Sequence, residues 1–154
     1  MVGHLRNSFY LKIFLLRRLP MALLAGLKVR HLDERECRVS VPYNFLTRNP
    51  FKSMYFAVQS MAAEFSTALL LVQQIESSKE NIALIIVSMN ADFVSRAQGQ
   101  AHFTCESDES ISAAIARTVK SGQPETVTLV SVGRSNEGEE VSTFTFTWSV
   151  KKRG

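Results

Sequence analysis

The sequence contains few of the residues that stabilise very small or fibrous folds. Its 154 residues include two cysteines, four prolines, seven glycines and one tryptophan. Cys37 and Cys105 are far apart in the sequence and match no zinc or redox spacing, so we expect buried, reduced thiols, with a disulfide as the alternative. Reduced thiols favour a cytoplasmic protein. A chain of this length buries roughly 70% of its unfolded surface and needs no structural metal to fold.

Residues that bind metals are also scarce. The three histidines are His4, His31 and His102, and they form no ligand cluster in the sequence. No spacing of acidic residues requires a metal either. We therefore predict no metal site and no bound cofactor.

Long hydrophobic runs are absent. No uninterrupted apolar run approaches the roughly 18 residues that span a bilayer. The basic pair Arg17-Arg18 interrupts the apolar residues near the N-terminus, and no small-residue cleavage site follows, so we expect no secretory signal peptide. Hydrophobic residues make up 45% of the chain and charged residues 21%, values that are typical of a globular domain.

The first 30 residues contain six basic residues and no acidic one. The remaining residues carry 12 basic and 14 acidic groups, so the basic charge is local and a nucleic-acid-binding surface is not expected. Apolar residues between Asn7 and Leu24 recur at helical spacing. We predict a basic amphipathic helix in residues 1–24, ahead of a domain in residues 25–154. This helix either packs on the domain or makes a peripheral contact with an anionic membrane or ligand.

The rest of the chain alternates between strand and helix patterns. Two short strands are predicted within Leu27–Tyr43, around a polar turn. A long amphipathic helix is predicted over Asn49–Glu76, with Asn49 as its N-cap and Pro50 at its first position. The continuous apolar run Ile82–Val87 is typical of a strand buried on both faces. Further strands are predicted at 100–106, 126–132 and 141–150, and a short helix between 108 and 122.

This order predicts an α+β fold in which the long helix lays its apolar stripe against a curved antiparallel sheet of five or six strands. Several short motifs accompany it: Leu27–Pro42, Thr47–Phe51, Asp92–Gly99, Thr145–Lys151, and an acid, Glu64, placed 15 residues after Asn49. Together they resemble the hotdog fold, and within it the family called domain of unknown function 4442. The relatives of this family include acyl-CoA thioesterases of the phenylacetate-degradation type.

The resemblance implies a homodimer or a tetramer with composite sites that use residues of both subunits. It implies that an acyl chain lies beside the central helix and that coenzyme A, as part of the substrate, lies near the surface. The Asn and the acid of the thioesterase type match Asn49 and Glu64, which are therefore the expected catalytic residues. In active relatives the thioester carbonyl points at the amino end of the helix, where free N–H groups stabilise an oxyanion.

Each catalytic candidate also has a structural interpretation. Glu64 lies beside an apolar stripe, where burial raises the pKa of a carboxyl group and suits a general base or nucleophile near neutrality. The alternative is a carboxylate at the helix rim, paired with a basic group. Asn49 either orients a water or a carbonyl with its amide, or only caps the helix.

Substrate contacts are expected around the start of the helix. Where the active type has His-Gly-Gly, this chain has Tyr55-Phe56-Ala57. The Tyr55 hydroxyl can donate a hydrogen bond in place of the His, whereas two aromatic rings can instead fill the acyl tunnel. The Arg96 guanidinium either binds phosphates of coenzyme A or is solvated at a strand end. The expected substrate-contacting residues are Ser53, Tyr55, Phe56, Ala57, Met61 and Arg96.

Two functions are therefore expected in the first place. One is an acyl-CoA thioesterase-like hydrolase that acts on a fatty or aromatic acyl thioester. The other is a non-catalytic hotdog dimer that binds an acyl-CoA or a fatty-acid-like ligand, which the two aromatic residues favour. A peripheral membrane protein that uses the basic N-terminal helix ranks third. A dehydratase of the same fold is disfavoured, because no histidine lies between Asn49 and Glu76.

Overall fold

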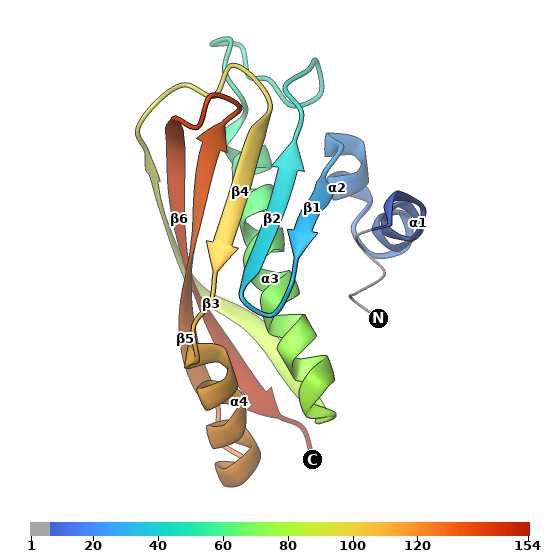
Figure 1. Cartoon of the computed structure of the whole chain (residues 1–154), viewed down its shortest axis with the longest axis vertical. Helices are drawn as coiled ribbons and strands as arrows, with labels where there is room; N and C mark the ends of the chain where they lie inside the picture. Colours follow the sequence, from blue (N-terminus) through green and yellow to red (C-terminus); the bar gives the residue numbers. More distant parts are fainter. Residues whose placement is uncertain (1–6) are drawn as a thin grey trace.

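One curved sheet wrapped around one long helix forms the body of the protein (Figure 1). The computed structural model of the chain describes residues 7–154. Six antiparallel strands follow the order β1-β2-β4-β5-β6-β3, and helix α3 packs across β2, β4, β5 and β6. The strands are β1 (Lys28–Leu32), β2 (Glu36–Val41), β3 (Ile82–Phe93), β4 (Ala101–Glu106), β5 (Glu125–Ser135) and β6 (Glu140–Lys152). The helices are α1 (Ser8–Arg18), α2 (Pro20–Ala25), α3 (Phe56–Ser78) and α4 (Ser110–Ser121).

This arrangement is the hotdog fold that the sequence predicts, with the expected sheet of antiparallel strands around a central helix. The predicted strand pair within Leu27–Tyr43 is confirmed as β1 and β2. The alternation predicted for 141–150 is also confirmed, because Phe144, Phe146, Trp148 and Val150 of β6 are buried. The apolar face of the closing strand therefore forms much of the core against α3.

The single amphipathic helix predicted in residues 1–24 forms two helices, and residues 1–6 of that prediction lie outside the described residues. The first ends just before Leu19, and the second begins at Pro20. Proline has no N–H to donate and restricts the residue before it, so one helix does not continue through this point. Leu11 and Leu15 of α1 are buried, and both helices lie beside the β1 edge of the sheet (Figure 1).

Helix α3 begins at Phe56, later than the helix predicted from Asn49. The dipeptide Asn49-Pro50 is typical of a helix start, but here the Asn49 side chain closes a tight turn that precedes the helix. The N-cap position belongs to Tyr55, whose side chain makes no capping hydrogen bond. The prediction that Asn49 caps the helix is therefore wrong.

Strand β3 lies at the edge of the sheet and pairs only with β6. The sequence predicts that Ile82–Val87 is buried on both faces, but Ile85 is 64% exposed and Val87 is 54% exposed. The run is apolar although no strand within residues 7–154 pairs with its second edge. Strand β3 therefore presents an apolar edge that a second polypeptide can cover.

Three buried hydrogen bonds connect α3 to the sheet, in an interface that is otherwise apolar. They join side chains of the helix to side chains of β5 and β6, and the bonded groups are buried from solvent. Ser142 Oγ donates to Gln59 Oε1 (2.8 Å), Trp148 Nε1 donates to Thr67 Oγ1 (3.1 Å), and the hydroxyls of Ser66 and Ser131 share a bond of 2.8 Å.

By length and composition alone, α3 is apolar enough to cross a membrane. However, 56% of its most apolar stretch is buried inside the fold. The sheet covers it, as is expected for the core helix of a globular domain.

The two cysteines are free and fully buried, as predicted. They are distant in the sequence, yet Cys37 of β2 lies directly opposite Cys105 of β4 in the sheet. Burial raises the pKa of both thiols, to about 12 for Cys105. Such thiols are poor nucleophiles, so they act as small apolar side chains of the core.

Replacing Ser142 with alanine is expected to lower the free energy of unfolding by about 1–3 kcal/mol, because Gln59 Oε1 would lose the hydroxyl that donates to it in a buried site. Urea unfolding measures the difference. The matched control is Thr126→Ala, which removes an exposed hydroxyl from β5 and is expected to change stability by less than about 0.5 kcal/mol. Equal losses in the two variants would contradict a special role for the buried contact.

Candidate functional site

The Asn49 side chain holds the turn before α3. Its Oδ1 accepts hydrogen bonds from the backbone N–H of Phe51 (2.9 Å) and of Ser53 (3.2 Å), and its Nδ2 donates to Ser53 Oγ (3.0 Å). The backbone N–H of Met54 bonds to the carbonyl of Ala97, which joins the turn to the segment after β3. The Asn49 amide therefore has a fixed orientation at the start of the helix.

A cleft of about 750 Å³ opens between this turn, the first residues of α3 and the segment that follows β3. We call it the Asn49 cleft. It brings together Asn49, Ser53, Tyr55, Phe56 and Arg96, all of which the sequence analysis selected.

Sequence reasoning missed other residues of the cleft. Arg48 belongs to the Thr47–Phe51 motif and precedes Asn49 directly, so its position was a usable signal. Gln59, in the first turn of α3, and Phe93, at the end of β3, also line the cleft, but Phe93 reaches it only because the fold brings the end of β3 close to the start of α3. No local sequence pattern predicts that these two parts of the chain lie close together.

The charges around the Asn49 cleft favour an anionic ligand. Arg48 and Arg96 line it, and no acidic residue of the described chain does. Arg96 is exposed, and the Arg48 guanidinium lies 5.5 Å from the centre of the Phe45 ring. Guanidinium groups present several donors to phosphate or carboxylate oxygens. The cleft therefore has the electrostatic character expected of a phosphate-bearing ligand's site.

The amino end of α3 adds backbone donors to the cleft. The N–H groups of Val58 and Gln59 bond to the carbonyl of Tyr55. The N–H groups of Phe56 and Ala57 have no acceptor among residues 7–154. Two free amides and the positive end of the helix dipole therefore lie at one place, which suits a carbonyl oxygen that gains negative charge.

The two aromatic residues at the helix start stay largely outside the core. Tyr55 is 46% exposed and Phe56 is 55% exposed, and their rings meet edge to face with centres 5.0 Å apart. Within one chain they do not fill an internal tunnel. They form an apolar wall of the cleft, and the Tyr55 hydroxyl is free to meet a ligand there.

Glu64 lies in a separate pocket of about 230 Å³, which we call the Glu64 pocket. Its walls are Met61 and Phe65 of α3 and the residues from Arg18 to Ala22, at the junction of α1 and α2. Burial among these mostly apolar groups raises the pKa of the Glu64 carboxyl to about 7. No salt bridge within the described part of the chain involves this carboxylate, so the expected pairing at the helix rim is not observed.

One chain does not bring Asn49 and Glu64 into the same cavity. Glu64 lies nine residues beyond Tyr55, which is about 13 Å along the helix axis. Ala57 is half-buried and lies outside both pockets. Met61 accompanies Glu64 and not the cleft. The predicted site residues therefore form two groups in one subunit.

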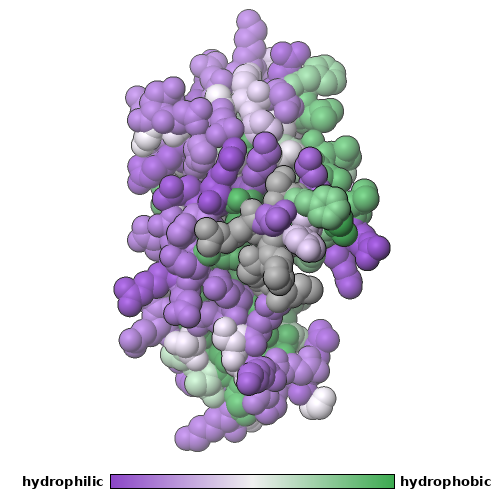
Figure 2. Space-filling view, turned by 45° about the vertical axis from the view of Figure 1, so that its right-hand side comes forward, coloured by the Kyte–Doolittle hydropathy of each residue, from purple (hydrophilic) through white to green (hydrophobic). Residues whose placement is uncertain are grey.

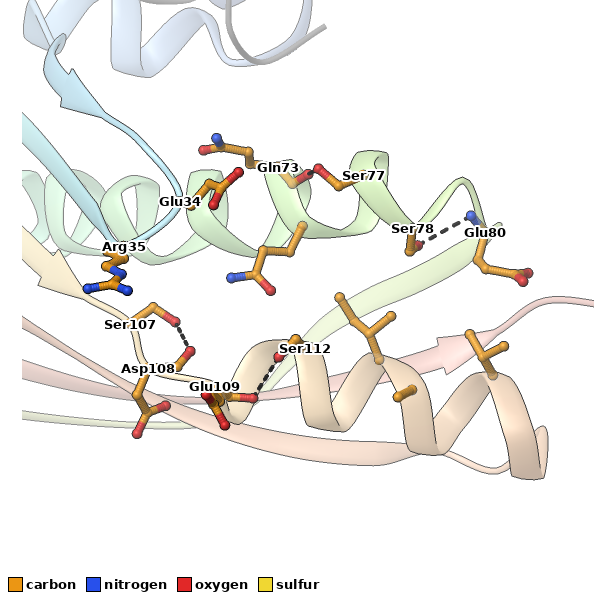
Figure 3. A pocket seen from close by; sticks show the side chains of 14 residues that line it. Glu34, Arg35, Gln73, Ser77, Ser78, Glu80, Ser107, Asp108, Glu109 and Ser112 are labelled. Atoms are coloured by element: carbon orange, nitrogen blue, oxygen red, sulfur yellow. Dashed lines mark hydrogen bonds between the residues drawn. The ribbon is translucent and has the colours of Figure 1, made fainter.

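A larger cavity, of about 910 Å³, lies at the far end of α3, between that helix, α4 and the β1–β2 turn (Figure 3). Four acidic residues line it, against one arginine, and the remaining polar groups are mostly serines and glutamines. A polyanion such as coenzyme A would be repelled there. Within residues 7–154 no cluster of histidine, cysteine and acidic side chains is arranged to hold a metal ion.

The family described as Domain of unknown function (DUF4442) matches residues 8–150. The match begins in α1, so it includes both N-terminal helices as well as the sheet. Among curated proteins, none matches the chain significantly.

Solved structures of the same fold match nearly the whole chain. A Pseudomonas aeruginosa protein of unknown function, named as a probable thioesterase, is 20% identical with a TM-score of 0.81, covering 98% of this chain and 100% of that one. A Chlorobaculum tepidum protein of unknown function is 14% identical with a TM-score of 0.82, covering 95% and 94%. A Haemophilus influenzae thioesterase is 14% identical with a TM-score of 0.70, covering 91% and 88%. At these identities the similarity establishes the fold.

The Glu64 carboxyl is expected to make stability depend on pH. Its pKa rises from an ordinary 4.5 to about 7 on folding, so the folded state binds the proton more tightly. Stability should therefore fall as pH rises from about 4.5 to about 7, by up to about 3 kcal/mol, and then level off. Urea unfolding across this range measures the effect. Glu64→Gln should flatten the curve. Parallel curves for wild type and Glu64→Gln would contradict the shift.

Proposed function

We propose that this chain, which belongs to the DUF4442 family, is a hotdog-fold hydrolase of acyl thioesters. The observation that carries the proposal is the Asn49 cleft, which joins two arginines and a fixed amide to the amino end of α3, where the backbone N–H groups of Phe56 and Ala57 begin the helix. A fatty or aromatic acyl-CoA suits this cleft best. Its phosphates complement Arg48 and Arg96, and its acyl group complements the aromatic wall. The fold of the Haemophilus influenzae thioesterase supports the same class of reaction.

In the proposed reaction, water attacks the thioester carbonyl carbon. The N–H groups of Phe56 and Ala57 donate to the carbonyl oxygen and stabilise its negative charge. The carboxylate of Glu64 accepts the proton of the water, and its pKa of about 7 suits a general base. The carbon–sulfur bond then breaks, and the leaving thiolate takes the proton from Glu64. The products are a free thiol and a carboxylic acid.

Because Glu64 and Asn49 lie apart in one chain, the proposed site needs a second copy. Strand β3 has a free edge, and Val87 and Met89 are 54% and 50% exposed on it. Ser60 of α3 contacts Met89, with 3.4 Å between Oγ and Sδ, so the start of α3 borders this edge. Glu64 lies one helical turn further along the same side of α3. Antiparallel pairing of two β3 edges would place these helix faces near one another. We propose a homodimer in which Glu64 of one subunit serves the cleft of the other.

A second candidate function is ligand binding without turnover. Tyr55 and Phe56 favour it, because bulky side chains at the helix start leave less room for a carbonyl to approach the amides than glycines do. In this case the cleft holds an acyl-CoA or a fatty-acid-like ligand, and Glu64 contributes only to the packing of α2 on α3.

The proposed chemistry uses water, backbone amides and one carboxylate, so it needs no cofactor apart from the coenzyme A of the substrate. We also propose a cytoplasmic location, because both cysteines are free thiols. Reduced thiols persist in reducing compartments.

Turnover is expected on at least one member of a panel of acyl-CoA thioesters, with free thiol release followed by absorbance. Glu64→Gln should lower kcat by about 10²–10⁴-fold, because it removes the base. Glu76→Gln, on the same helix and outside both pockets, is the matched control and should retain full kcat. Turnover that Glu64→Gln leaves unchanged would exclude the mechanism.

The same assay separates the other outcomes. Arg96→Gln should raise KM for the coenzyme A thioester and leave KM unchanged for the N-acetylcysteamine thioester of the same acyl group, which carries no phosphate. An equal change for both would exclude phosphate recognition by Arg96. Saturable binding of acyl-CoA without turnover on any chain length would favour the binding function.

The double variant Val87→Lys/Met89→Lys is expected to convert the dimer into a monomer, because lysines on an edge strand oppose pairing of two edges. Light scattering after size-exclusion chromatography measures the mass, and circular dichroism confirms the fold. Val130→Lys changes a residue that is 43% exposed on the inner strand β5 and serves as the control. A wild-type monomer at micromolar concentration would contradict the proposed interface.

A further inference from the structure

Helix α1 carries an exposed apolar stripe that the fold does not use. Phe9, Ile13 and Leu16 are 67%, 38% and 64% exposed, whereas Leu11 and Leu15 are buried on the body. At 3.6 residues per turn, the three exposed side chains lie within about 60° of one another, on the side of the helix opposite the buried ones. The helix is therefore apolar on two opposite faces, and only one of them is covered by the described residues.

Two cations flank the exposed stripe. Lys12 lies on one side of it and Arg17 on the other, each about 40° beyond the nearest apolar side chain. Both are exposed. Long basic side chains beside an apolar stripe reach the level of lipid headgroups while the stripe enters the acyl region.

The apolar surface continues beyond α1. Leu19 between the helices, and Met21 and Leu24 of α2, are 40%, 64% and 61% exposed. Figure 2 shows hydrophobic side chains gathered along one side of the molecule, next to predominantly polar surface. The exposed residues of both helices thus extend one apolar surface rather than forming isolated spots. We call this surface the α1–α2 face.

The charged residues of the segment that forms the α1–α2 face all have the same sign. No acidic residue occurs between positions 7 and 32, and the first is Asp33. The basic residues of that segment are Lys12, Arg17, Arg18, Lys28 and Arg30, and all five are exposed. A segment that joins exposed apolar side chains to cations and contributes no acid of its own is complementary to an anionic lipid surface.

We propose that the α1–α2 face docks on the surface of an anionic lipid bilayer. A second copy of the chain fits this face less well. A symmetric contact would place the face against itself, so that Lys12 and Arg17 would meet the same cations with no carboxylate to pair them. Lipid phosphates supply the missing negative charge, and the acyl region covers the apolar stripe.

Docking would also place the lipid surface next to the Glu64 pocket, since the junction from Arg18 to Ala22 belongs to both. An apolar chain that leaves the bilayer at this point would meet α3 directly. This consequence rests on the proposed function, whereas docking itself does not.

The full chain is expected to sediment with vesicles of phosphatidylcholine and phosphatidylserine at low salt, and much less with phosphatidylcholine alone. Phe9→Gln/Ile13→Gln/Leu16→Gln keeps good helix formers and should abolish sedimentation. Lys12→Gln/Arg17→Gln should lower the partition coefficient at least about tenfold, since each cation near an anionic surface contributes about 1 kcal/mol. Thioester hydrolysis in solution is measured in parallel and should stay unchanged, so failure of docking and failure of the proposed function are separate results.

Matched controls isolate the face from general effects. Phe45→Gln/Leu46→Gln removes two apolar side chains, 79% and 65% exposed, from a loop outside α1 and α2. Lys151→Gln/Arg153→Gln removes two positive charges, as Lys12→Gln/Arg17→Gln does, but from the C-terminal end of the chain. Both should sediment as wild type does. The proposal is overturned by a wild-type chain that stays in solution, or by a triple variant that still sediments. It is also overturned if the wild type does not sediment with vesicles and light scattering shows a smaller oligomer for the triple variant than for the wild type. In that case a second copy of the chain covers the face.

Discussion

The buried hydrogen bonds between α3 and the sheet fix where the helix lies and how it is rotated. Apolar packing alone allows several arrangements that bury similar areas, so it does not by itself select one. A buried hydrogen bond does, because a shift along the helix or about its axis leaves a donor or acceptor unpaired, at a cost of about 1–3 kcal/mol for each group. The bonds join Gln59 to Ser142, Ser66 to Ser131 and Thr67 to Trp148.

Both groups of candidate residues depend on this constraint. Gln59 lies in the first turn of α3, so its bond to the sheet holds the free amides of Phe56 and Ala57 next to the Asn49 turn. Ser66 and Glu64 are two residues apart and therefore point to nearly opposite sides of the helix. The contact that holds Ser66 against the sheet thus turns Glu64 away from it, toward α2, where burial raises the pKa of its carboxyl. Anchoring and chemistry occupy opposite faces of one helix.

The sequence predicts the fold well because local patterns and tertiary packing agree over most of the chain. The period of two in residues 141–150 and the long amphipathic segment predicted an α+β fold with a long helix against an antiparallel sheet, and the resemblance of several motifs to a known family identified it as the hotdog fold. The errors arose where a pattern has two physical solutions. Asn49-Pro50 suits a helix start, but the Asn49 side chain finds its donors in a turn. An apolar run such as Ile82–Val87 is compatible with a strand buried on both faces, and equally with an edge strand whose apolar side chains a second polypeptide can cover. Tertiary packing separates Glu64 from Asn49 and brings Phe93 to the cleft. Local sequence patterns do not predict either position.

The facing cysteines of β2 and β4 give the sheet an internal reporter. Both thiols are inaccessible and have raised pKa values, so a thiol reagent in solution reacts with them only after Cys37 and Cys105 have come apart from their neighbours. The rate of labelling therefore counts how often the middle of the sheet opens. The natural cysteines can therefore be used, without an added dye or an engineered residue, to measure the rate of local opening of the sheet that encloses the central helix.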